Sequence, residues 1–168
     1  MTENTPIPAV PANRTPPTDV TERDVYITRA FDAPREVVWR FFTEPEQLAA
    51  WFGPVGFSVP IDSVTTELHE GGRWELTMVD DATGDGYPVR GRITSCIAPE
   101  YLEVVLSAET GAGPLENVVL SIQFHDHGER TRITLHQGPF TDEMREQTAA
   151  GWEESFVKLD QLFAEARS

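Results

Sequence analysis

Acid–base side chains occur at two places in this 168-residue chain where they could do chemistry. Asp62 and His69 lie close together in the sequence, and His136 lies on the last strand that the sequence predicts. A histidine beside a carboxylate can carry out general acid–base catalysis, because its unperturbed pKa lies near neutrality. His69, Asp62 and His136 are therefore candidate catalytic residues. The alternative is that each is a solvated or hydrogen-bonded surface group, since nothing in their spacing requires catalysis.

The sequence predicts no metal site and no cofactor. His125-Asp126-His127 could bring two imidazoles to one ion, because alternate residues of a strand share a face. However, Asp126–Glu129 has the composition of a hairpin turn, which would put both histidines at its rim. The acidic run at 80–86 lacks the spacing of a calcium loop. No glycine-rich phosphate loop or nucleophile elbow is present.

The segment 140–168 has the only long helical pattern in the chain. Its apolar stripe has a helical period and consists of Met144, Trp152, Phe156, Leu159, Phe163 and Ala166, with Thr148 and Ser155 on the same face. So bulky a stripe must pack on a large apolar surface, and a long helix across one curved sheet tends to leave a space. Gly151 is unusual there, because glycine costs about 1 kcal/mol relative to alanine inside a helix. A close approach, a bend at a cavity mouth or a packing need would each explain it.

Short strands precede this helix. Val25–Phe31 predicts a first strand, and two short helices follow it, with Pro34 and Pro45 near their starts and Gly53-Pro54 after them. Six further strands are predicted at about 57–68, 73–80, 88–97, 101–109, 116–126 and 130–138. The turns between them are short, which implies antiparallel neighbours. Alternating apolar residues give the sheet one apolar face. The predicted fold class is therefore α+β, with the helices on a single face.

Composition limits the possible partners. The formal net charge is −15, with 13 Lys and Arg against 28 Asp and Glu, which argues against nucleic acid and anionic membranes. A single cysteine, Cys96, allows no internal disulfide and fits a reducing, cytoplasmic environment. No run reaches the roughly 20 apolar residues of a membrane-spanning helix. Residues 1–24 are rich in proline and predict a disordered tail, followed by one domain at 25–168.

Several motifs occur in an order that resembles a known family. They are Ala33–Trp39, Thr43–Leu48, Trp51-Phe52-Gly53-Pro54, Gly71-Gly72-Arg73-Trp74, Tyr87–Gly91, Ala98–Leu102 and Gly151-Trp152 with Phe156, Leu159 and Phe163. Together they resemble the heat-shock ATPase activator homology (AHSA-like) family, within the START-like, birch-allergen-like SRPBCC superfamily. The resemblance spans roughly residues 25–165 and is specific for a fold rather than for an activity.

The resemblance implies a helix-grip fold, in which a seven-stranded antiparallel sheet wraps around the long C-terminal helix and encloses a cavity. Such a cavity would suit a flat or elongated apolar ligand. The expected ligand-binding residues are Trp39, Trp51, Phe52, Trp74, Leu76, Met78, Leu120, Ile122, Trp152, Phe156 and Leu159. The alternative for each of them is that it simply fills the core.

Three functions remain open at this point. The leading hypothesis is a non-enzymatic binder of a small hydrophobic or aromatic molecule, such as a lipid or a polyketide-like compound, acting as a monomer or weak homodimer. The second is a cyclase or aromatase-type enzyme, with a related version in which the protein sequesters a toxic metabolite, because Gly71–Trp74 also resembles an element of self-resistance proteins in enediyne producers. The third is a co-chaperone-like protein-interaction domain.

Overall fold

The computed structural model describes residues 23–110 and 113–167. The elements follow one another in this order: β1 (Val25–Phe31), α2 (Arg35–Thr43), α3 (Pro45–Trp51), β2 (Phe57–Ser58), the short 3₁₀ helix η2 (Ile61–Ser63), β3 (Thr65–Thr66), β4 (Trp74–Asp80), β5 (Gly86–Ile97), β6 (Tyr101–Thr110), β7 (Gly113–His127), β8 (Arg130–Gly138) and α4 (Asp142–Arg167). The predicted sequence of a strand, two short helices, further strands and a long helix is confirmed.

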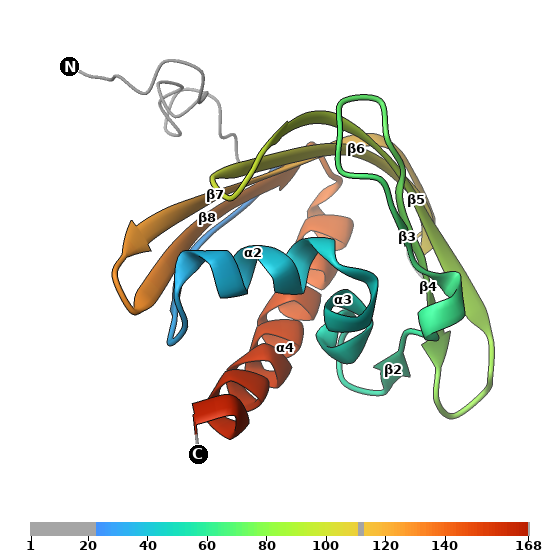
Figure 1. The fold of residues 1–168 in the computed structure, drawn as a ribbon. Helices are drawn as coiled ribbons and strands as arrows, with labels where there is room; N and C mark the ends of the chain where they lie inside the picture. The colour runs from blue at the N-terminus through green and yellow to red at the C-terminus, as the bar shows by residue number, and fades with distance from the viewer. Residues whose placement is uncertain (1–22, 111–112, 168) are drawn as a thin grey trace.

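The strands form one curled antiparallel sheet (Figure 1). Its seven-strand path runs β1-β8-β7-β6-β5-β4-β2, and the two-residue β3 pairs with β4 off this path. The first strand therefore pairs with the last, β1 with β8, from Val25 opposite Gln137 to Phe31 opposite Thr131. Because the chain otherwise proceeds strand by strand, most pairings are hairpins, as the short turns predicted.

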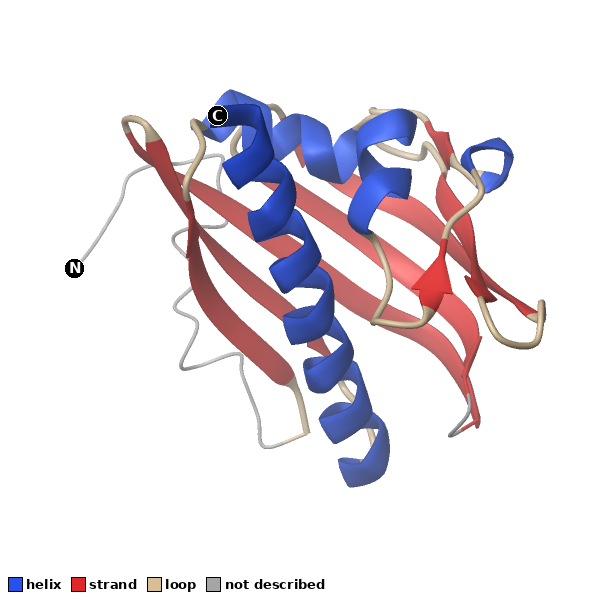
Figure 2. Cartoon of the chain, turned by 90° about the horizontal axis from the view of Figure 1, so that it is seen from below, coloured by secondary structure: helices blue, strands red, loops and turns tan. Residues whose placement is uncertain are grey.

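The three α-helices of the described residues lie on the concave face of the sheet (Figure 2). The long helix α4 crosses the strands obliquely, and α2 and α3 lie beside it over one end of the sheet (Figures 1 and 2). Arg29 of β1 attaches the sheet edge to α4 through two hydrogen bonds to Asp160, at 2.9 and 2.7 Å. These partners raise the pKa of Arg29 above its ordinary value. The fold is the expected α+β helix-grip arrangement.

The strand predicted over 57–68 is the main local error of the sequence analysis. The structure has two short strands here, β2 and β3, separated by η2. Pro60 is the N-cap residue of η2. Proline has no backbone N–H to give to a strand ladder, so the pairing stops at this point. The Ser63 hydroxyl then donates to the Pro60 carbonyl at 2.7 Å, which holds the turn together.

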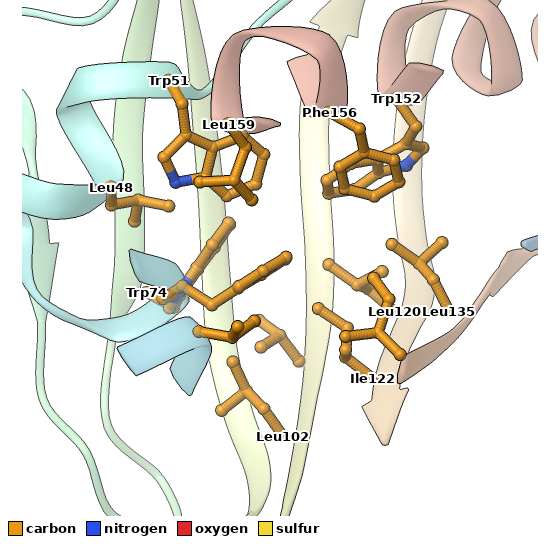
Figure 3. Close-up of a cluster of buried hydrophobic side chains, with 14 of the residues drawn as sticks. Leu48, Trp51, Trp74, Leu102, Leu120, Ile122, Leu135, Trp152, Phe156 and Leu159 are labelled. Atoms are coloured by element: carbon orange, nitrogen blue, oxygen red, sulfur yellow. The ribbon is translucent and has the colours of Figure 1, made fainter. Parts of the chain in front are cut away.

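The core lies between the concave face and the helices (Figure 3). Large side chains from α3 and α4, including Trp51, Phe156 and Leu159, pack over Leu120 and Ile122 of β7 (Figure 3). The predicted tail at 1–24 falls outside the described residues except for its last two. Arg23 accepts a backbone hydrogen bond from Phe140 at 2.8 Å.

Candidate functional site

A cavity of about 400 Å³ lies between α4, the sheet and the loop that follows α3. Its wall is mainly apolar, and this part of the wall comprises Phe52, Phe57, Met78, Val89, Leu106, Leu115, Met144 and Trp152. The volume lies in the range of about 300–1,000 Å³ that small-molecule sites occupy. Exposed Gln147 and half-buried Tyr87 also line it, so the cavity reaches the surface beside them.

The space exists because the sheet-facing stripe of α4 changes in bulk along its length. Toward the C-terminal end, Phe156, Leu159 and Phe163 are fully buried and fill the gap to the sheet. Further toward the N-terminal end the stripe carries Thr148 and Ser155, whose side chains are short, and both line the cavity. A helix held at one distance from the sheet leaves a void wherever its side chains are too short to reach across.

Gly151 lies in the middle of this short-chain stretch. A Cβ atom added to it would meet nothing within 4 Å outside its own helix surroundings. No close approach or packing contact therefore requires glycine at this position, and the residue lines the cavity instead. Of the explanations that the sequence left open, the structure therefore excludes a close approach and a packing need.

Trp152 carries the main polar contact inside the cavity. Its indole Nε1 donates to Oε1 of Gln137 at 2.8 Å. Gln137 is only 4% exposed, and it lies on the inward face of β8 together with Ile133 and Leu135. The ring of Trp152 stacks on Phe156 with centroids 5.5 Å apart and meets Phe52 edge-on at 5.6 Å. The indole is thereby fixed between the cavity and the aromatic core.

The loop after α3 covers one side of the cavity and is fastened to α4. The backbone N–H of Val55 donates to Oε1 of Glu154 at 2.9 Å. Nζ of Lys158 donates to the Phe57 carbonyl at 3.3 Å and to the Pro54 carbonyl at 3.5 Å. Partial burial lowers the pKa of Lys158 below its ordinary value. These bonds hold Phe52–Phe57, hereafter the α3–β2 loop, against the helix.

The structure separates the residues that the sequence proposed as ligand contacts into two groups. Phe52, Met78 and Trp152 line the cavity. The others lie in the core around it and do not line it: Trp39, Trp51, Trp74, Leu76, Leu120, Ile122, Phe156 and Leu159. The indole N–H groups of Trp51 and Trp74 donate to backbone carbonyls of α2, at Phe41 (2.7 Å) and Phe42 (3.0 Å).

The candidate catalytic residues do not meet at the cavity. Asp62 is exposed in η2, and His69 is exposed in the turn before β4. His136 is half-buried and alternates on β8 with the inward Leu135 and Gln137, which places it on the convex face. There its Nε2 lies 3.0 Å from Oδ2 of Asp24. None of the three lines the cavity.

Sequence reasoning did not identify Gln137 at all; it placed Thr148 and Ser155 on the sheet-facing stripe without naming them as wall residues, and it considered a cavity mouth as one explanation of Gly151. Gln137 could have been found by strand alternation, because Ile133 and Leu135 fix the inward face of β8 and Gln137 continues it. Over residues 23–110 and 113–167, no three His, Cys, Asp or Glu side chains come together as a metal site. In the same residues no helix is long and apolar enough to cross a membrane.

A curled antiparallel sheet around a long C-terminal helix, with an apolar cavity between them, defines a helix-grip fold. Residues 32–164 match the family model described as "Activator of Hsp90 ATPase homolog 1-like protein". The chain belongs to this family. Comparison of the sequence with curated proteins finds no match.

Solved structures support the same fold at low sequence identity. The AHSA1 (SPO3351) protein from Silicibacter pomeroyi superposes with a TM-score of 0.74 at 23% identity, and the match covers 85% of this chain and 99% of that one. Protein CV1439 from Chromobacterium violaceum gives a TM-score of 0.73 at 21% identity, with coverages of 84% and 97%. CalU16 from Micromonospora echinospora gives 0.59 at 22% identity, with coverages of 82% and 74%. At these identities the similarity extends to the fold alone.

Proposed function

We propose that this protein binds a small apolar or aromatic molecule in the cavity between α4, the sheet and the α3–β2 loop. The observation that carries the proposal is the cavity itself, about 400 Å³ in volume with a mainly apolar wall. Apolar surface left in contact with water is unfavourable by roughly 25 cal/mol per Å². A ligand that replaces water along this wall recovers that free energy.

Binding alone accounts for the side chains at the site. The wall offers hydroxyl and amide groups, from Tyr87, Gln137, Gln147, Thr148 and Ser155, and these can orient a ligand through hydrogen bonds. The candidate acid–base residues lie elsewhere. A cyclase-type enzyme, a metabolite-sequestering protein and a co-chaperone are alternatives that no specific contact in the structure favours over simple binding.

The indole signals of the four tryptophans provide the test. We would record amide NMR spectra during titration with neutral polycyclic aromatics, lipids and polyketide-like compounds. The Nε1–H signal of Trp152 should move, because this indole lines the cavity. The corresponding signal of Trp39, which packs on Phe124 under α2 at a centroid distance of 5.2 Å, serves as the internal reference. A folded spectrum in which Trp152 stays unmoved by every compound would contradict the proposal.

A further inference from the structure

The side-chain amide of Gln137 has a fixed orientation. An indole nitrogen can only donate a hydrogen bond, so the atom of Gln137 that faces Nε1 of Trp152 must be the carbonyl oxygen. The NH₂ group of Gln137, Nε2, therefore points away from the indole. This settles which end of the amide remains available.

Nε2 of Gln137 has no hydrogen-bond acceptor among the described residues. The only hydrogen bond of this side chain in the described residues is the one with Trp152, and Gln137 is not among the residues with further interactions. Nε2 is also not completely buried. In the described residues, the completely buried side-chain polar atoms without a hydrogen-bond partner are Nε of Arg35 and Nε of Arg145. Since Gln137 is 4% exposed and lines the cavity, its NH₂ group faces the cavity space.

Charge is missing from the cavity wall in the described part of the chain. No Asp, Glu, Lys, Arg or His lines it. Arg145, Glu146 and Glu153 are next in sequence to wall residues of α4 but do not line the cavity. Glu154 and Lys158 of the same helix are bonded to the α3–β2 loop. A carboxylate placed in this cavity would lose its hydration without a counter-charge, which is costly. A neutral oxygen has a much smaller desolvation cost and can still accept from an amide N–H.

We propose that the ligand is a neutral apolar molecule with a carbonyl oxygen, and that this oxygen accepts a hydrogen bond from Nε2 of Gln137. This inference rests on the proposed function and narrows it to a class of ligand. Gln137 selects ketones, quinones and similar neutral carbonyl compounds over both plain hydrocarbons and carboxylates. The preference for carbonyl compounds arises because a bound hydrocarbon would leave the NH₂ group of Gln137 without a hydrogen-bond acceptor, whereas a carbonyl oxygen supplies one.

Three tricyclic compounds separate these possibilities: 9-fluorenone, fluorene and fluorene-9-carboxylate. They share a ring system and differ at one carbon, which carries a carbonyl, two hydrogens or a carboxylate. We expect fluorenone to bind about tenfold more tightly than fluorene, from one net hydrogen bond to a buried donor. Fluorene-9-carboxylate should bind more weakly than either. In the NMR titration, the Gln137 NH₂ protons should shift downfield with fluorenone and not with fluorene.

Two substitutions test the role of Gln137. Gln137→Leu removes the donor at similar volume, and the preference for fluorenone over fluorene should fall from about tenfold to about one. Gln137→Glu keeps an acceptor for Trp152 but replaces the NH₂ group by oxygen, so the preference should be lost or reversed. The second variant retains the indole contact and decides the matter if the first does not fold.

The outcomes of the two proposals are distinguishable. Equal wild-type affinities for fluorenone and fluorene, or tightest binding of the carboxylate, would overturn the carbonyl inference and leave the proposed function intact. A fluorenone preference that persists in folded Gln137→Glu would also overturn it. Absence of binding by all three compounds would instead count against the proposed function itself.

Discussion

Adding a side chain at Gly151 should stabilise the protein and reduce the volume of its cavity. In Gly151→Ala the new methyl group meets no neighbour within 4 Å, so no steric cost opposes it. Alanine is more favourable than glycine in a helix interior by roughly 1 kcal/mol. For a chain of this length that gain corresponds to a rise in Tm of about 2–4 °C. The expected sign is the opposite of that for a glycine needed by close packing.

A larger side chain at the same position should affect binding more than stability. Leucine at position 151 extends from α4 into the cavity of about 400 Å³, toward the wall that includes Met78 and Leu106. Burying its side chain stabilises the fold by up to about 2 kcal/mol, which offsets any local rearrangement. It also occupies volume that the ligand needs. We expect Gly151→Leu to fold normally and to weaken binding of 9-fluorenone by at least about tenfold, a loss of about 1.4 kcal/mol.

The assay combines urea unfolding with a fluorenone titration of the same samples. Ala150→Leu is the matched control, because Ala150 is the preceding helix residue, is exposed and does not line the cavity. It should leave the affinity unchanged. Destabilisation by Gly151→Ala would refute the open-space interpretation of this glycine. Undiminished binding in a folded Gly151→Leu protein would refute the placement of the ligand.

Three further perturbations follow from individual contacts. Trp74→Phe removes the indole bond to the Phe42 carbonyl and should lower the free energy of unfolding by about 2 kcal/mol in urea titrations. Burial lowers the pKa of His125 to about 4 in the folded protein. As the pH falls below about 6.5, this histidine is therefore protonated in the unfolded chain before it is protonated in the folded one. The free energy of unfolding should consequently be lower by about 1 kcal/mol at pH 5. His125→Gln should flatten that slope, and an unchanged slope would exclude His125 as its source. Lys158→Met frees the carbonyl of Phe57 in the α3–β2 loop, and stopped-flow measurements should show ligand release accelerated roughly fivefold.

The fold was predictable because its signals are periodic. Alternation in 116–126 and the helical stripe from Met144 to Phe163 each describe a whole element, and each correctly identified the buried face. The break within 57–68 was not predicted, because Val59 and Ile61 continue an apolar pattern across Pro60. Because Pro60 has no N–H to donate to a neighbouring strand, the strand ends here despite the apolar pattern, and the proline itself was visible in the sequence.

The cavity was harder to locate from the sequence, because a cavity forms where side chains are short, whereas the sequence pattern is dominated by the large ones. Large aromatic and aliphatic residues were the predicted ligand contacts, and of these Phe52, Met78 and Trp152 line the cavity. The structure places Trp51, Trp74 and Phe156 in the packed core, where their size fills the volume that a ligand would need. The signal for a cavity was instead Thr148 and Gly151, short residues on a stripe that otherwise carries large ones. Their effect depends on the distance between helix and sheet, which no local pattern specifies.

The candidate catalytic residues show a different limit. The sequence shows which polar residues lie near a histidine along the chain. It does not show directly on which face of the sheet a strand residue such as His136 lies, and that face decides whether the side chain can reach the cavity. On β8 the inward residues are odd-numbered, so the polar group inside the cavity is Gln137 and not its neighbour His136. A shift of one residue exchanges an imidazole for an amide, and with it acid–base chemistry for hydrogen-bonded recognition.

The helix α4 therefore divides stability and recognition along its length. Its C-terminal part holds the sheet through Phe156, Leu159 and Phe163, all buried to within 2% exposure. Its N-terminal part carries the short residues of the cavity wall and contributes less to packing. The two parts meet where Trp152 stacks on Phe156, so changes there affect both, whereas Met144 and Thr148 lie two or more turns before Phe156 and can change with little effect on its packing. In this chain the N-terminal half of α4 lines the cavity, while Phe156, Leu159 and Phe163 hold the helix on the sheet.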